Sequence, residues 1–163
     1  MTLTHTQSQT VDLLIKQEEK IAELYDIFSK QFSQHASFWK ELSLAEVRHA
    51  KLLKELKELT NKNQIIFDEG KLTANTLHAY LLRLDGVLLK AKQNEFTLQT
   101  ALSCAVDYES SLVEKKVFSL FNSSNKKTRE VLKILQIETE NHVEYIKNIQ
   151  RSISNVSKLQ PKG

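Results

Sequence analysis

The sequence predicts an all-α protein made of long antiparallel helices packed as a bundle. Only three glycines and one proline occur among 163 residues, so the chain has few turn signals and favours long helices. Apolar residues recur at alternating steps of three and four, which is the period of an amphipathic helix. The length fits a single domain, with its core at about residues 10–153 and polar tails at both ends.

The first helix is predicted to begin at a cap formed by Thr10 or a nearby polar residue, and to end before a break at residues 33–37. Glu18 stands where the apolar pattern of this helix asks for an apolar side chain. Residues of the predicted apolar stripe are Val11, Leu14, Ile21, Tyr25, Phe28 and Phe32. Glu18 is therefore predicted to point into the core.

The second helix is predicted at about residues 38–59, and its inward face again carries ionisable side chains. Glu46 and His49 are three residues apart, so both leave the same face of the helix. The apolar members of that face are Phe38, Leu42, Ala45, Leu52, Leu56 and Leu59. A linker follows at residues 60–71, and its apolar side chains Ile65, Ile66 and Phe67 are expected to pin it onto the bundle.

Three more helices are predicted at about residues 73–92, 94–121 and 128–153, with a polar tail from Ser154 that frays. The fourth helix has Glu109 on its core face, among Leu98, Ala101, Leu102, Ala105, Leu112 and Val113. The last has His142 on a stripe shared with Val131, Leu135, Tyr145, Ile149 and Ile153. Either Glu138 or Thr139 precedes His142 by about one turn.

Composition argues against several classes of function. The formal net charge is +3, with lysines and glutamates interspersed and no basic block, so nucleic acid is not an expected partner. The N-terminus lacks the apolar run of a secretory signal, and no stretch is long enough to cross a bilayer, so no membrane is expected. Cys104 is the only cysteine, which predicts a reducing, cytoplasmic setting without disulfides.

The two halves of the chain repeat one arrangement of ionisable residues. Glu18 precedes Glu46 and His49 in the first half, and Glu109 precedes the Glu138–His142 region in the second. Four antiparallel helices would bring these side chains to one layer of the core. A dinuclear iron or manganese site needs this set, because carboxylates neutralise two divalent cations and one imidazole completes each.

Four segments carry a resemblance to a known family: QEEKIAELYDIF, FWKELSLAEVRHAKLL, ALSCAVDYESSLVEKKVF and ILQIETENHVEYI. In order and spacing the chain resembles the rubrerythrin branch of the ferritin-like superfamily over about residues 11–153. The resemblance implies a ferritin-like antiparallel four-helix bundle with an additional helix in the long crossover between the second and third bundle helices. It further implies non-haem iron, two ions per site, with manganese or partial occupancy as alternatives. Metal ligands implied by it are Glu18, Glu46, His49, Glu109 and His142.

One position departs from the family pattern. The second Glu-x-x-His should have its carboxylate at position 139, where this chain has Thr139. Glu138 is four residues before His142, so it is a candidate to replace the missing ligand. The alternative is that Glu138 is a charge on the helix surface. If only one metal binds, we expect it at the end formed by Glu18, Glu46 and His49.

Three functions remain open from the sequence. The resemblance implies an oxidoreductase that acts on hydrogen peroxide or O2, or oxidises iron, with no catalytic residues beyond the metal ligands. Because the chain lacks a rubredoxin-type cysteine module, a separate electron-donor protein is implied, and a homodimer is expected. Metal sequestration without turnover is the second possibility. A metal-free helical scaffold, favoured by Thr139, is the third. Tyr25, Tyr108 and Tyr145 are candidate hydrogen-bond donors to ligand carboxylates, with ordinary core packing as the alternative.

Overall fold

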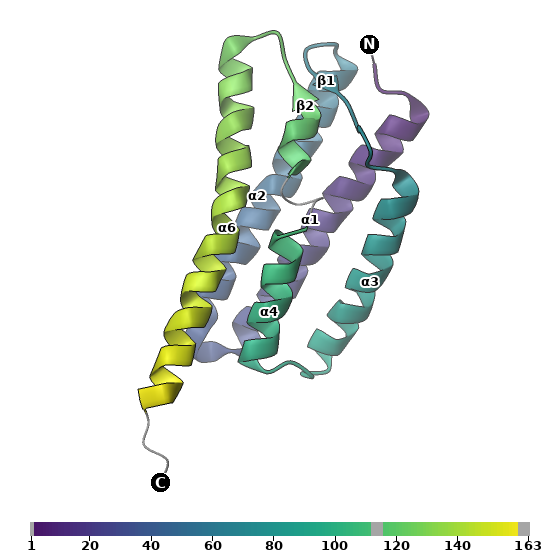
Figure 1. Cartoon of the computed structure of the whole chain (residues 1–163). Coiled ribbons are helices and arrows are strands. Elements are labelled where there is room, and N and C mark those ends of the chain that lie inside the picture. Colours follow the sequence, from purple (N-terminus) through teal and green to yellow (C-terminus); the bar gives the residue numbers. More distant parts are fainter. Residues whose placement is uncertain (1, 112–115, 160–163) are drawn as a thin grey trace.

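The computed structural model describes residues 2–111 and 116–159. Within them five α-helices pack as an all-α bundle (Figure 1), which confirms the predicted class. The helices are α1 at His5–Gln31, α2 at Ala36–Asn61, α3 at Ala74–Lys92, α4 at Leu98–Glu109 and α6 at Lys126–Leu159. Two short 3-10 helices lie in the connections, η1 at Ser33–His35 and η2 at Val117–Leu120.

In sequence order α1 is antiparallel to α2 and α4 is antiparallel to α6, while α3, the additional helix of the crossover, runs parallel to α1. α1 packs along α2 on one side and along α3 on the other, while α4 packs on α6. The chain therefore crosses from the α1–α2 pair to the α4–α6 pair through α3, as expected from the resemblance (Figure 1).

A two-stranded ribbon ties the crossover to the segment before α6. β1, Ile66–Phe67, pairs antiparallel with β2, Phe121–Asn122, so that Phe67 lies opposite Phe121. Ile65 and Phe67 are buried, but Ile66 is 66% exposed because successive side chains of a strand point to opposite faces. The prediction that Ile66 also pins the linker is wrong.

The first helix begins earlier than predicted. Its cap is Thr4, whose hydroxyl accepts a hydrogen bond from the backbone N–H of Gln7, while the Gln7 side chain accepts one from the backbone of Thr4. This reciprocal pair satisfies two N–H groups that a helix end leaves unpaired. Thr10 lies inside the helix, is buried, and donates to the carbonyl of Thr6.

The fourth predicted helix is too long at both ends. Asn94 has a φ of 57°, in the left-handed region, and the helix starts only after Thr97, which forms a second reciprocal cap. α4 ends at Glu109, and the later residues 117–122 form η2 and β2 instead. Pairing of Phe121 with Phe67 holds that segment extended, and this contact is invisible to helical periodicity. Leu112 and Val113, predicted on the core face, lie outside the described residues.

The last helix is longer than predicted and is rotated slightly about its axis. It begins at Lys126, behind Asn125, whose side chain accepts from the N–H of Thr128, and it continues to Leu159 instead of fraying from Ser154. Val131 and Tyr145 are 47% and 38% exposed, so their assignment to the core stripe is wrong. Leu135 is buried as predicted, and the neighbouring residues Leu132, Val143 and Ile146 take further inward positions. Where two adjacent residues of this helix are both apolar, the sequence alone does not tell which of them faces the core.

The apolar core has two parts, and they lie on either side of one polar layer. One part surrounds Trp39, with Tyr25 and Leu84 among its members, and the other includes Leu14 and Phe118. Along α1 and α2 the residues between these two parts include the buried carboxylates described below. The fold therefore holds its ionisable groups in a layer that is closed by apolar side chains at both ends.

Candidate metal centre

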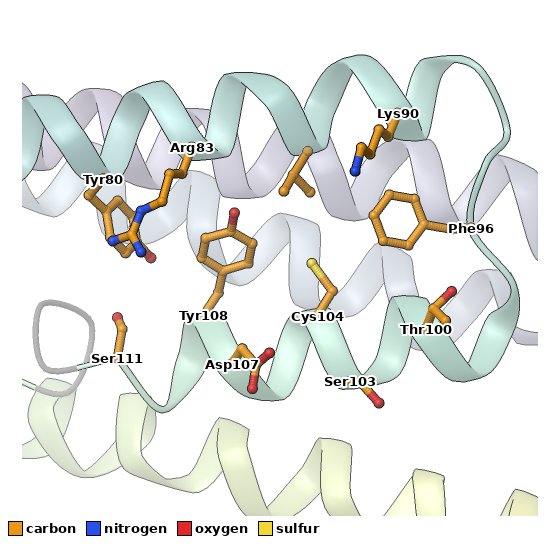
Figure 2. A pocket seen from close by; sticks show the side chains of 11 residues that line it. Tyr80, Arg83, Lys90, Phe96, Thr100, Ser103, Cys104, Asp107, Tyr108 and Ser111 are labelled. Carbon is orange, nitrogen blue, oxygen red and sulfur yellow. The ribbon is translucent and has the colours of Figure 1, made fainter.

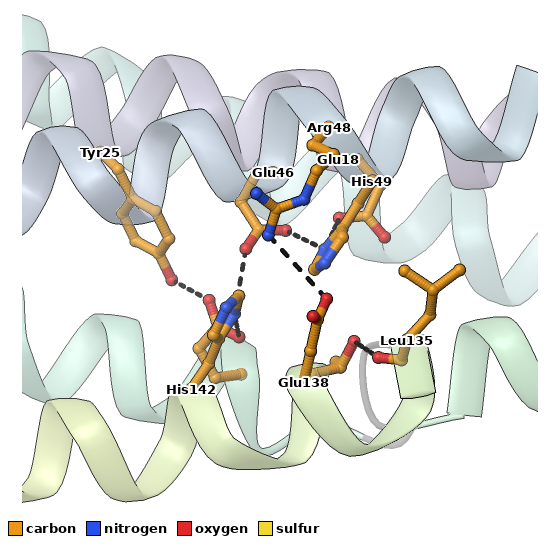
Figure 3. A network of polar contacts seen from close by, with 10 residues as sticks. Glu18, Tyr25, Glu46, Arg48, His49, Leu135, Glu138 and His142 are labelled. Carbon is orange, nitrogen blue, oxygen red and sulfur yellow. Dashed lines mark hydrogen bonds and ion pairs between the residues drawn. The ribbon is translucent and has the colours of Figure 1, made fainter. Parts of the chain in front are cut away.

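Five ionisable side chains from four helices meet in the layer between the two apolar parts (Figure 3). α1 contributes Glu18, α2 contributes Glu46 and His49, α4 contributes Glu109, and α6 contributes His142. The first four are fully buried, and the side chain of His142 is 14% exposed. The structure thus brings together five of the six residues that the sequence singled out as metal ligands.

The first cluster consists of Glu18, Glu46 and His49. Nδ1 of His49 lies 3.2 Å from Oε2 of Glu46 and 4.0 Å from Oε2 of Glu18. The spacing of three on α2 places the carboxylate and the imidazole one turn apart on the same face. Glu18 reaches them from α1, the antiparallel neighbour of α2.

The second cluster consists of Glu46, Glu109 and His142. Nδ1 of His142 lies 3.3 Å from Oε1 of Glu46 and 3.4 Å from Oε2 of Glu109. Glu46 is therefore common to both clusters, with Oε2 facing His49 and Oε1 facing His142 (Figure 3). The two imidazole rings stack with their centroids 5.5 Å apart.

Burial and mutual contact shift the proton affinities of these groups. Burial opposes ionisation of Glu46, but contacts with His142 and His49 outweigh it and hold the pKa of Glu46 well below its usual range. Burial, together with the charge of Glu46, raises the pKa of Glu109. Burial alone would lower the pKa of His142, yet its contacts with Glu109 and Glu46 raise that pKa to about 10. Both neighbouring carboxyl groups thus favour the protonated form of His142.

Tyr25 fixes the orientation of one carboxylate. Its buried hydroxyl donates to Oε1 of Glu109 at 2.7 Å, which leaves Oε2 facing His142. This confirms one of the three tyrosines proposed as donors. Tyr108 instead packs edge-on against Tyr80, and Tyr145 donates to Glu41 at the surface.

Glu138 lies outside both clusters. Its side chain is 44% exposed and lies 3.9 Å from Arg48 of α2 (Figure 3). Thr139 takes the inward position, fully buried, and its hydroxyl donates to the carbonyl of Leu135 at 3.0 Å. A hydroxyl that is already bonded to its own helix is a poor substitute for the missing carboxylate.

Sequence reasoning missed two neighbours of the site. Phe118 packs edge-on against His49 with the ring centroids 5.2 Å apart. Arg48 borders a surface hollow of about 300 Å³ that reaches His142, with Glu41 and Tyr145 also on its wall. Neither residue interrupts an apolar stripe, so periodicity alone could not single them out. The hollow gives small molecules an approach to the second cluster.

Comparison with known proteins found no match to this chain among family models, curated proteins or solved structures. In the described residues, no helix combines the length and apolar character needed to span a membrane. The functional argument therefore rests on the geometry of the two clusters.

Proposed function

We propose that the two clusters hold a dinuclear metal centre and that the chain is a ferritin-like protein of the rubrerythrin type. The observation that carries the proposal is the position of Glu46. Its two carboxylate oxygens face two different histidines, at 3.2 Å and 3.3 Å, as a carboxylate bridging two ions would. Glu46 is thus the residue that would hold both ions together.

The donor atoms fit divalent cations in kind and in spacing. Divalent transition ions hold oxygen and nitrogen ligands at about 2.1 Å, so two donors on one ion lie at most about 4.2 Å apart. The histidine-to-carboxylate separations in both clusters are between 3.2 and 4.0 Å. Oε1 of Glu46 and Oε2 of Glu109 are also buried, and they face Nδ1 of His142 at 3.3 and 3.4 Å. Burying such oxygens is costly unless a cation or a proton compensates.

The two clusters are expected to differ in their affinity for metal ions. Two divalent ions carry four positive charges, whereas Glu18, Glu46 and Glu109 supply three negative charges. The first cluster is fully buried, and neither of its two carboxylates accepts the hydrogen bond of Tyr25, which goes to Glu109 of the second cluster. The second has lost the ligand at Thr139, and its imidazole must first release a proton. We therefore expect the first cluster to fill before the second.

The redox class is proposed from the resemblance, and the carboxylate and imidazole ligands suit iron and manganese alike. Two ferrous ions held by these carboxylates and imidazoles would supply one electron each to peroxide or O2 and become ferric. The residues of this chain hold the carboxylates in place, flank them with apolar layers that exclude bulk water, and leave a hollow beside His142. A peroxide-reducing or ferroxidase activity is the function proposed, with manganese as an alternative metal. A separate electron-donor protein, a homodimer and a cytoplasmic location belong to the same proposal.

Metal content is the direct test, with Glu46→Gln as the key variant. Glutamine keeps the size of Glu46 but removes the charge that both ions share, so metal bound per chain should fall by tenfold or more after equilibrium with limiting Fe(II) or Mn(II). Glu138→Gln is the matched control, because it removes a carboxylate from the same neighbourhood outside both clusters. It should leave the metal content unchanged.

Reactivity is measured on the loaded protein. Stopped-flow mixing of Fe(II)-loaded protein with hydrogen peroxide should show faster loss of Fe(II) than in buffer. Metal uptake without that acceleration would leave sequestration as the function. A metal content near zero, with a melting temperature unchanged by Fe(II) or Mn(II), would contradict the metal centre altogether.

A metal-free scaffold is the second candidate, and Thr139 is the observation that favours it. The Thr139 hydroxyl is satisfied within its own helix, and His142 can neutralise part of the carboxylate charge as an imidazolium. In that case the buried groups form a structural ion-pair network. The same metal-content measurement separates the two candidates.

A further inference from the structure

A cavity lies away from the metal centre, in the groove between α3 and α4 (Figure 2). Its volume is about 620 Å³, within the range of roughly 300–1,000 Å³ that is usual for small-molecule sites. One wall is a stripe of α3 that includes Tyr80, Arg83 and Lys90. The opposite wall is a stripe of α4 that includes Cys104 and Tyr108.

Two cations face this cavity without a counter-ion. Arg83 and Lys90 are seven residues apart, so they share one face of α3 and lie about 10.5 Å apart along its axis. In the described part of the chain neither forms an ion pair, although Lys92 on the same helix pairs with Glu23 at 2.7 Å. Asp107 on α4 supplies one negative charge to the wall but lies beyond ion-pair distance of both. The cavity therefore has a surplus of one positive charge.

The rest of the lining combines apolar and aromatic side chains, Val87, Phe96, Cys104 and the two tyrosines, with the hydroxyls of Thr100, Ser103 and Ser111. Phe96 closes one end, and Tyr80 and Tyr108 meet edge-on at 5.7 Å towards the other. Burial raises the pKa of Tyr108, so its hydroxyl stays neutral and available as a donor. Aromatic faces bind flat apolar groups, and cations combined with hydroxyl donors bind a carboxylate or a sulfonate.

We propose that the groove between α3 and α4 is a binding site for an aromatic monoanion, whose acidic group pairs with Arg83 or Lys90 while its ring packs against Phe96 and the two tyrosines. The site does not depend on the metal centre, because none of its lining residues belongs to either cluster. It gives the crossover helix a role of its own.

Anilinonaphthalene sulfonate is a suitable probe, because it combines an aromatic body with one negative charge and fluoresces when it leaves water. Titration of the full-length protein should give saturable binding of one probe per chain. The double variant Arg83→Gln, Lys90→Gln should weaken that binding by about tenfold or more, since hydrogen bonds to charged groups are the stronger ones. Lys92→Gln, the matched control on the same helix, should not change it.

A neutral analogue separates the charge from the apolar contact. Phenylnaphthylamine has the same aromatic body without the sulfonate, so its affinity should be equal for the wild type and the double variant. Phe96→Ala should weaken both probes, and circular dichroism should show that every variant is folded. Equal sulfonate affinity in the wild type and the double variant would overturn the proposal, as would non-saturable binding of several probes per chain.

Discussion

At the scale of single residues, the chain places costly groups where only mutual contact can stabilise them. Glu18, Glu46, His49 and Glu109 are all fully buried, and an unpaired charge in such a place costs several kcal/mol. Each therefore lies against another member of the layer or against a donor from outside it. The contribution of individual contacts can be tested by substitutions that leave the helices intact.

Tyr25→Phe removes one hydroxyl from the core. The buried hydrogen bond to Glu109 is lost, and we expect the free energy of unfolding to fall by about 1.5–3 kcal/mol in urea denaturation. Tyr145→Phe is the control, because it removes an exposed hydrogen bond to Glu41 and should cost less than about 0.5 kcal/mol. Equal losses in the two variants would show that Tyr25 does not support the charged layer.

Thr139→Glu restores a carboxylate three residues before His142. Without metal a fourth buried carboxylate should lower the melting temperature, because it adds an uncompensated charge. With Fe(II) or Mn(II) the variant should show a larger rise in melting temperature than the wild type and a metal content closer to two per chain. Thr139→Gln, equal in size to glutamate but without charge, should show neither the larger metal-induced rise nor the added metal. A variant that gains no metal relative to Thr139→Gln would refute the assignment of the second cluster.

At the scale of helices, periodicity predicted most of what the structure contains. Glu18, Glu46 and Glu109 stood out because each interrupts an apolar stripe, and a helix converts that interruption into an inward direction. The β1–β2 ribbon could not be predicted, because two residues per strand carry no period and their partners are more than fifty residues apart. The register of α6 was ambiguous, since Val131 and Leu132 are both apolar and only packing selects Leu132.

The crossover helix offers a prediction of its own. Leu84 of α3 is fully buried in the apolar part that includes Trp39, so Leu84→Ala should cost about 2–5 kcal/mol of unfolding free energy. Leu82 on the same helix is 74% exposed, and Leu82→Ala should cost less than about 0.5 kcal/mol. Both should unfold in one transition if the chain is a single domain, as we propose. A small loss for Leu84→Ala would mean that α3 is attached loosely to the bundle.

At the scale of the whole molecule, the polar layer couples stability to pH. The folded-state pKa of His142 is raised from 6.5 to about 10, so its contribution is fully present below pH 6.5 and is lost as the pH rises towards 10. Metal-free protein should therefore lose unfolding free energy over that window, and His142→Gln should lack this loss. Chemical denaturation across the pH series measures it. An identical pH profile for the two proteins would contradict the contacts of His142 with Glu46 and Glu109.

Metal binding at the second cluster should become stronger as the pH rises over the same range, whereas the stability of the metal-free protein falls. A cation at the second cluster competes with a proton for Nδ1 of His142, so occupancy there should increase with pH. The first cluster, whose ligands stay in place without His142, should fill at lower pH. The two halves of the layer are thus distinguishable in one protein.

Anomalous diffraction at the iron or manganese absorption edge, from crystals equilibrated with one of these ions, tests the central claim most directly. The account predicts a strong peak between Glu18, Glu46 and His49 and a weaker peak between Glu46, Glu109 and His142. Absence of any peak in the layer would contradict the metal centre. A peak beside His142 alone would contradict the order in which the two clusters fill.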